Sequence, residues 1–239
     1  RRQRQMCIRD RLYNVAFILV NMVIGIAIAI LITEVKNIKL KKLYQSAILL
    51  PFLMSMVILS YIVYALLSAE NGLVNNSILP LFHMDPIQWY QKPKYWPAIL
   101  IIANCWKGVG YGCLIYIASL IGIDPSFYEA ARLDGASKWQ EITKITLPSL
   151  VPTIITLLLL SIGRIFYSDF GLFYQVPMNS GVLVSTTNVI DTYVYRALIE
   201  QGNISMSSAA GVYQSLVGFC VVMLSNWIVR KVDKDQALF

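Results

Sequence analysis

Long runs without charged side chains constrain the fold of this chain more than any other feature of its sequence. Four runs carry no charged residue and a fifth carries only Lys107; they cover residues 12–33, 43–69, 96–121, 145–163 and 201–229. An apolar helix needs about 20 residues to cross a bilayer. A segment inside lipid must be helical, because no water is there to satisfy its backbone polar groups. The sequence therefore predicts an all-α, polytopic bundle of membrane helices with five spans.

The overall composition excludes a soluble protein. Hydrophobic residues make up 57% of the 239 residues, charged residues make up 14%, and the mean hydropathy is +0.60. A soluble domain carries roughly 25% charged residues, so this chain lacks the polar surface that a soluble enzyme or binding module needs. The net charge of +7 does not indicate nucleic-acid binding, since five of the twenty Lys and Arg residues fall within the first eleven positions.

The first eleven residues stand apart from the rest of the chain. Residues 6–10, Met-Cys-Ile-Arg-Asp, resemble the translation of a sequencing adapter. We interpret residues 1–11 as an adapter-derived segment, with a genuine basic arm as the alternative, and exclude them from fold reasoning. Residues 12–239 are treated as one transmembrane domain. We also expect a further span upstream of residue 12 in the native chain.

Basic residues predict which side of the membrane each loop occupies. Short cytoplasmic loops carry an excess of Lys and Arg. With the loop at residues 122–144 in the cytoplasm, ten basic residues lie inside and three lie outside. A sixth uncharged run, residues 170–190, is polar and contains Pro177 and Gly181. We expect this run to lie at the outer face without crossing, because a sixth crossing would put the basic C-terminal tail outside.

The cytoplasmic loop carries the most specific pattern in the chain. Asp124 can cap a short helix that has Pro125 at its first position, and Gly135 can end that helix in a left-handed conformation. Ser137, with Gln140 three residues later, predicts a capping box at the start of a second helix. The loop at residues 124–146 therefore predicts a rigid elbow of two short helices.

This elbow resembles the "EAA" motif of the permease subunits of ABC importers. The matching residues are Glu129, Ala130, Ala131, Gly135, Ile145, Leu147 and Pro148. Asp134 and Trp139 resemble the sugar-permease branch of that family, and residues 71–75 and 189–196 resemble its LplB-type members. In this family the motif forms a coupling helix that docks on a cytoplasmic ATPase subunit.

The resemblance implies the type I importer permease fold, with six spans in the native chain, in the bacterial plasma (inner) membrane. It also implies four protein partners: two ABC ATPase subunits, a second permease subunit in a heterodimer, and an extracytoplasmic sugar-binding protein. The implied substrate is an oligosaccharide or a related sugar. ATP hydrolysis then belongs to the partner subunits, so we expect no catalytic residue and no cofactor in this chain.

Polar residues within the spans are the candidates for a substrate pathway, because sugars present hydroxyl groups and apolar C–H faces. Charged residues inside a membrane are costly and point to function. The candidates are Asn104, Lys107, Tyr111, Arg164, Tyr167, Tyr213 and Gln214. Two alternatives remain open at this point. These side chains can instead form hydrogen bonds between helices, and Arg164 can reach toward the interface.

Other chemistry finds little support in the sequence. His83 is the single histidine, and the cysteines lack the spacing of a metal site. Gly108, Gly110 and Gly112 lack the Lys-Ser/Thr ending of a phosphate-binding loop, so we assign them to close helix packing. Two alternatives to sugar import remain: a permease of the same class for an amino acid, phosphate or peptide, and an ATP-independent carrier.

Overall fold

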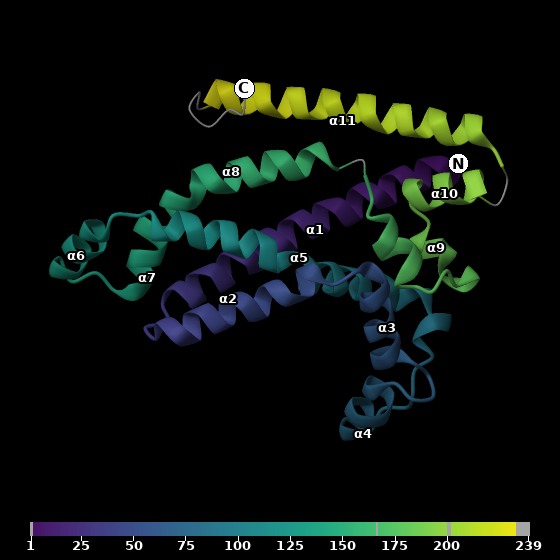
Figure 1. Cartoon of the computed structure of the whole chain (residues 1–239), viewed down its shortest axis with the longest axis horizontal. Coiled ribbons are helices and arrows are strands. Elements are labelled where there is room, and N and C mark those ends of the chain that lie inside the picture. The colour runs from purple at the N-terminus through teal and green to yellow at the C-terminus, as the bar shows by residue number, and fades with distance from the viewer. Residues whose placement is uncertain (1, 166, 200–201, 233–239) are drawn as a thin grey trace. The chain divides into compact units, whose positions relative to one another are not determined.

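The computed structural model describes residues 2–165, 167–199 and 202–232, and within these residues every regular element is helical (Figure 1). The longer helices are α1 (Arg2–Thr33), α2 (Ile38–Leu53), α3 (Met56–Leu67), α5 (Trp96–Ile121), α8 (Leu147–Gly163), α10 (Ile190–Ile199) and α11 (Ile204–Val232). The shorter ones are α4 (Leu79–Leu81), α6 (Pro125–Leu133), α7 (Lys138–Glu141) and α9 (Val184–Thr187). Single π-helical turns cover Val74–Ile78, Ile142–Thr146 and Gly171–Gln175, and 3₁₀ turns cover Trp89–Gln91, Pro93–Tyr95 and Gly181–Leu183.

Four helical segments of the described residues are long and apolar enough to cross a membrane. They are Ile8–Thr33, Pro93–Ile121, Lys138–Gly163 and Ile204–Lys231. These four segments confirm four of the five spans that the uncharged runs predict. The polar run at residues 170–190 contains no such helix, as expected, and forms short turns and α9 instead.

The fifth predicted span is helical but broken. Residues 43–69 fall into α2 and α3, which meet at a sharp bend, so that the pair forms either a broken span or a re-entrant loop. Two local features explain the break. Pro51 lies in the last turn of α2 and removes one backbone donor. Ser55 starts a new helix, because its side chain accepts a hydrogen bond of 3.3 Å from the amide of Ile58.

The chain divides into two compact units, to which α1, α5 and α11 each contribute. Among the described residues, unit 1 comprises those within 2–17, 53–107 and 163–220, and unit 2 comprises those within 18–52, 108–162 and 221–232. Each unit has a buried apolar cluster of its own. The hydrophobic runs of the sequence therefore supply core side chains as well as surface for lipid.

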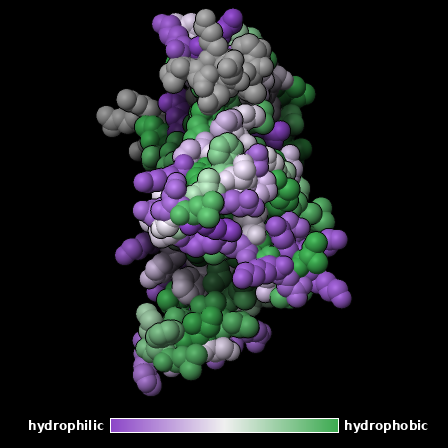
Figure 2. All heavy atoms as spheres, turned by 90° about the vertical axis from the view of Figure 1, so that its left-hand side faces the viewer, coloured by the Kyte–Doolittle hydropathy of each residue, from purple (hydrophilic) through white to green (hydrophobic). Residues whose placement is uncertain are grey.

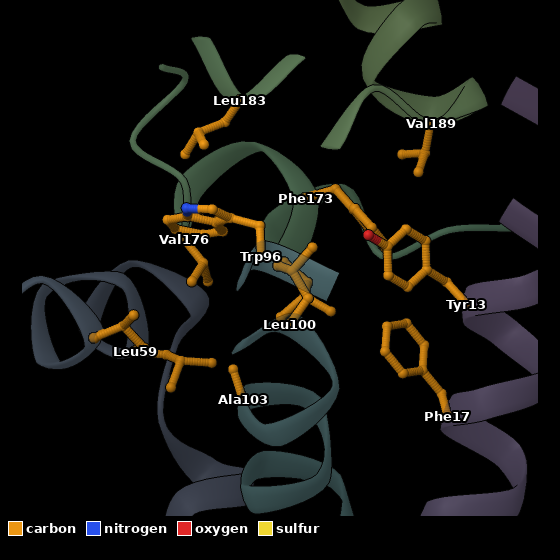
Figure 3. Close-up of a cluster of buried hydrophobic side chains, with 12 residues drawn as sticks. Tyr13, Phe17, Leu59, Trp96, Leu100, Ala103, Phe173, Val176, Leu183 and Val189 are labelled. Atoms are coloured by element: carbon orange, nitrogen blue, oxygen red, sulfur yellow. The ribbon is translucent and has the colours of Figure 1, made fainter. Parts of the chain in front are cut away.

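The core of unit 1 is rich in aromatic side chains (Figure 3). Tyr13 and Phe17 project from α1 toward Phe173, and the rings of Tyr13 and Phe173 meet edge to face with centroids 5.0 Å apart. Trp96 is fully buried at the start of α5, and its indole nitrogen donates a 2.9 Å hydrogen bond to the carbonyl of Trp89. The uncharged run at residues 170–190 is thus partly a core element of unit 1.

A buried asparagine organises the connection between α3 and α5 in unit 1. The amide of Asn75 donates to the carbonyls of Ser68, Ala69 and Ile87 over 2.9–3.3 Å. Its side-chain oxygen accepts from the backbone of Ile87 and from the indole of Trp89. Because buried backbone groups must be paired, this one side chain fixes a loop that has little regular structure.

The core of unit 2 depends on close approach between helices. A Cβ atom at Gly110 of α5 would lie 2.1 Å from the carbonyl oxygen of Ile48 in α2, whereas one at Gly112 meets nothing within 4 Å. Gly108 is intermediate, since a Cβ there would lie 3.6 Å from the side chain of Asn21. The prediction of close packing is thus confirmed most clearly at Gly110 and fails at Gly112.

Candidate functional site

The elbow at residues 124–146 belongs to unit 2, and its first helix, α6, is fixed at both ends. The Asp124 side chain accepts a 2.9 Å hydrogen bond from the amide of Ser126, which lowers the pKa of Asp124. Gly135 adopts φ +78°, and its amide donates to the carbonyl of Arg132. The next amide, that of Ala136, donates to the carbonyl of Ala131 over 2.9 Å. Together these two bonds form a Schellman motif, which confirms the predicted role of Gly135.

The second helix, α7, begins with the predicted capping box. The hydroxyl of Ser137 accepts from the amide of Gln140, and the Gln140 side chain accepts a 2.7 Å bond from the amide of Ser137. A π-helical turn, Ile142–Thr146, then leads into α8. The elbow is therefore continuous with a long membrane helix.

Side-chain contacts fasten α6 to α7 and to the π-helical turn. Glu141 is buried, and its carboxylate accepts a 2.8 Å bond from Nε of Arg132 and a 3.0 Å bond from Nζ of Lys138. The bond to Glu141 raises the pKa of Arg132. The hydroxyl groups of Tyr128 and Thr146 lie 3.0 Å apart. The elbow thus has a polar, paired interior.

The outward side of the elbow combines apolar and charged groups. Phe127, Leu133 and Trp139 are 61%, 89% and 72% exposed, and Glu129 and Ala130 are exposed between them in sequence. In Figure 2, which views the chain from the side of α6 and α7, hydrophobic patches lie among hydrophilic ones. Such exposed apolar side chains rimmed by polar groups are typical of a protein-binding surface.

The structure separates the predicted coupling residues, which are those of the EAA motif together with Asp134 and Trp139, into two places. Glu129, Ala130, Asp134, Gly135 and Trp139 lie at the exposed elbow, where Ala131 is half-buried. Ile145 and Leu147 are half-buried and Pro148 is exposed where the π-helical turn passes into α8. The motif therefore describes both a surface and its attachment to a membrane helix.

Sequence reasoning missed two exposed side chains of this surface. Phe127 and Leu133 do not belong to the motif, yet with Ala130 they recur every three residues along α6. Residues three apart share one side of a helix. This spacing was the signal that could have identified them.

The candidate pathway residues of α5 make structural contacts. Lys107 is half-buried, and its ammonium donates a hydrogen bond to the carbonyl of Met54, at the break between α2 and α3. Tyr111 stacks on Phe52 of α2, with ring centroids 5.2 Å apart and an interplanar angle of 19°. Asn104 is half-buried. The contact of Lys107 fits the alternative in which a polar side chain joins helices.

The other pathway candidates lie in unit 1, and a carboxylate that the sequence prediction omitted contacts one of them. Gln214 is buried and donates to the carboxylate of Asp191 over 3.3 Å, while the amide of Ser168 donates to the other oxygen of Asp191. Burial raises the pKa of Asp191. The hydroxyl of Tyr167 lies 2.9 Å from that of Ser215.

Two further candidates are exposed. Arg164 follows the last residue of α8, and Tyr213 is 52% exposed on α11. Of the seven candidates, Tyr111 belongs to unit 2 and the other six belong to unit 1. Within the described parts of the chain, no three His, Cys, Asp or Glu side chains come together in a way that could hold a metal ion.

Comparisons with known proteins identify the family. Residues 21–234 match the model of the family described as "Binding-protein-dependent transport system inner membrane component". The chain is 33% identical over 217 residues to the polygalacturonan/rhamnogalacturonan transport system permease protein YteP of Bacillus subtilis, and 31% identical over 208 residues to protein LplB of the same organism. These matches cover 89% and 87% of this chain but only 65% and 64% of those proteins.

A solved structure shows the same fold over nearly the whole chain. In the crystal structure of a bacterial alginate ABC transporter in complex with an alginate pentasaccharide-bound periplasmic protein, one chain is 31% identical and superposes with a TM-score of 0.90. The match covers 98% of this chain and 81% of that one. The resemblance seen in the EAA motif is thereby confirmed. The chain belongs to the binding-protein-dependent transport system inner membrane components, a family of membrane permease subunits.

Proposed function

We propose that this chain is a transmembrane permease subunit of an ABC importer that carries oligosaccharides or related sugars. In this proposal, one of two ATPase subunits binds the elbow at residues 124–146, the other binds the second permease, and the motion driven by ATP reaches the membrane helices through α6. A second permease subunit completes the pathway as a heterodimer, and an extracytoplasmic protein delivers the sugar. The chain itself hydrolyses no ATP.

One observation carries the proposal: α6 is a rigid helix whose outward side offers both apolar and charged contacts. A helix that transmits force must keep its shape under load, and α6 is closed by Asp124 at one end and by the Schellman motif of Gly135 at the other. Phe127, Leu133 and Trp139 supply apolar area that a partner can cover. The exposed Glu129 supplies a charge for orientation.

The sugar substrate is supported by the relatives. Among them are a polygalacturonan/rhamnogalacturonan transport system permease and, among solved structures, a chain of an alginate ABC transporter. The polar and aromatic candidates within the spans, such as Asn104, Tyr111 and Tyr213, suit a substrate with hydroxyl groups and apolar C–H faces. A permease for an amino acid, phosphate or peptide has no comparable support.

The test is uptake by the complete transporter in proteoliposomes. This chain is coexpressed from its own genomic neighbourhood with the second permease subunit, the ATPase subunits and the binding protein. ATP-dependent uptake of labelled oligosaccharides is then measured. We expect saturable uptake that depends on both ATP and the binding protein. Uptake that proceeds without ATP would establish the carrier alternative.

Replacement of Glu129 then tests the role of α6. Glu129 is exposed, so Glu129→Lys leaves the fold intact but reverses a charge on the proposed docking surface. We expect sugar uptake and sugar-stimulated ATP hydrolysis to fall together by about tenfold or more, as for the loss of a central interface contact. Lys39→Gln, an exposed change on α2, is the matched control. Unchanged uptake by Glu129→Lys would contradict the assignment of the elbow.

A further inference from the structure

A chain of ion pairs runs from the elbow to the end of α1 within unit 2. Arg132 of α6 bonds Glu141 of α7 through Nε at 2.8 Å, and Lys138 bonds the same carboxylate at 3.0 Å. Lys138 also bonds Glu34, the residue that follows α1, at 3.1 Å. The ammonium of Lys138 thus joins two acids that lie 107 residues apart in the sequence, Glu34 and Glu141.

The middle of this chain of ion pairs is buried and therefore depends on its partners. The side chain of Glu141 is 4% exposed. A buried carboxylate that loses its cations keeps the cost of its own desolvation, so Glu141 strongly favours conformations in which Arg132 and Lys138 stay in place. The contact of α6 with α7 is consequently stiff.

The Lys138–Glu34 ion pair links α7 to the end of α1, two elements that are far apart along the backbone. A displacement of α6 reaches α8 through the continuous backbone of α7 and the turn Ile142–Thr146. It reaches α1 only across space, and in the described residues Lys138–Glu34 is the ion pair that spans this distance. The ends of α1 and α8 also share the buried apolar cluster of unit 2, through Ala29, Ile32 and Leu150, so the Lys138–Glu34 pair adds a direct polar link from the elbow itself to the end of α1.

We propose that Arg132, Glu141, Lys138 and Glu34 form a brace that makes the ends of α1 and α8 move together with the coupling helix. The four are positioning residues, since they act through α6 rather than on substrate or ATP. The proposal rests on the proposed function and adds to it a specific route from the elbow to a second membrane helix. None of the four belongs to the EAA-motif positions that the sequence singled out.

A purely local role makes a different prediction. The side chains of Lys138 and Glu34 are 57% and 52% exposed, and exposed ion pairs often contribute little to stability. If the Lys138–Glu34 pair is only such a surface contact, its removal leaves transport unaffected. If the pair is part of a brace, its removal uncouples the transporter: the complex still assembles and hydrolyses ATP, but it transports less sugar per ATP.

The experiment measures sugar uptake and ATP hydrolysis in the same proteoliposomes. Glu34→Gln removes the link to α1 but keeps the pairs of Glu141, and Lys138→Met removes the central cation. We expect both variants to retain the ATPase subunits through purification and to hydrolyse ATP, while uptake per ATP falls about threefold or more, a coupling typical of such networks. Lys138→Arg keeps the charge and should preserve the ratio, as should Lys39→Gln.

The outcomes separate the brace from the function on which it rests. A wild-type transporter without ATP-dependent uptake would remove the proposed function. An active wild type whose Glu34→Gln and Lys138→Met variants keep the normal ratio of uptake to ATP would remove the brace alone. In a cysteine-free background, the double substitution Glu34→Cys and Lys138→Cys should lower uptake per ATP, and a thiol cross-link between the two cysteines should restore it, because the cross-link replaces the Lys138–Glu34 ion pair. Loss of uptake on cross-linking would show that the two positions must separate, which overturns the proposal.

Discussion

At the scale of single residues, Gly110 and Gly112 of α5 give a matched pair. A Cβ at Gly110 would lie 2.1 Å from the Ile48 carbonyl oxygen, so Gly110→Ala must push α2 and α5 apart. Overpacking of this kind costs typically about 1–3 kcal/mol. We expect Gly110→Ala to lower the apparent melting temperature of the detergent-solubilised protein, while Gly112→Ala, with open space around it, leaves it unchanged. Equal effects of the two substitutions would show that α2 and α5 do not meet at Gly110.

Gly135 illustrates a backbone requirement of a single residue. Its φ of +78° is unfavourable for a side chain with a Cβ, by about 1–2 kcal/mol, although asparagine tolerates this region better than branched residues do. We expect Gly135→Val to speed amide hydrogen exchange in residues 130–137 and Gly135→Asn to change it much less. Similar exchange in both variants would mean that the Schellman motif does not hold the end of α6.

At the scale of elements, the capping box should determine whether α7 persists. Ser137 and Gln140 satisfy each other's backbone amides, and loss of a capping side chain costs about 0.5–2 kcal/mol. A four-residue helix has little else to stabilise it. We expect Ser137→Ala to speed amide exchange at Lys138–Glu141, whereas Ser137→Asp, which can also accept the bond, preserves protection. Full protection in Ser137→Ala would show that the ion pairs of Glu141 alone maintain α7.

The sequence predicts best those elements whose ends are set by interactions between residues a few positions apart. Asp124, Pro125, Gly135 and the Ser137–Gln140 pair define α6 and α7 through contacts within a few residues, and the structure places each as predicted. The link from Lys138 to Glu34 spans 104 residues, and no local pattern indicates it. The break near Ser55 is similar, since the uncharged run at 43–69 passes through it without a change of hydropathy.

At the scale of the whole molecule, hydropathy predicts an all-helical membrane chain, because backbone polar groups inside lipid must form hydrogen bonds within the segment itself. It does not predict how polar side chains inside the spans pair. Hydropathy is equally consistent with a substrate pathway and with a contact between helices for Lys107. Its hydrogen bond to the Met54 carbonyl supports the contact, and the pathway role stays a prediction. Asp191 lies within the segment 189–196 that resembles LplB-type members, but no local pattern predicts that it joins Ser168 to Gln214. Such pairings depend on packing that only the folded chain defines.

The number of membrane crossings depends on the bend between α2 and α3. The described part of the chain has five crossings if this pair is one broken span and four if it is a re-entrant loop. If the pair is one broken span, Lys39 in the first turn of α2 and Lys92 after α3 lie on opposite sides of the membrane. If the pair is a re-entrant loop, both lie on the same side. Lys92 and Lys144 flank the long helix α5 and therefore lie on opposite sides in either case.

Single cysteines at these three positions, in a background without the native cysteines, distinguish the two topologies. Because basic residues favour the cytoplasm, we expect a membrane-impermeant maleimide to label Lys92→Cys in intact cells, and to label Lys39→Cys and Lys144→Cys only after permeabilisation. Labelling of Lys39→Cys together with Lys92→Cys would make the pair re-entrant and leave four crossings. Labelling of Lys144→Cys shows the side of the elbow independently of α2 and α3. We expect it to place the elbow in the cytoplasm in either topology.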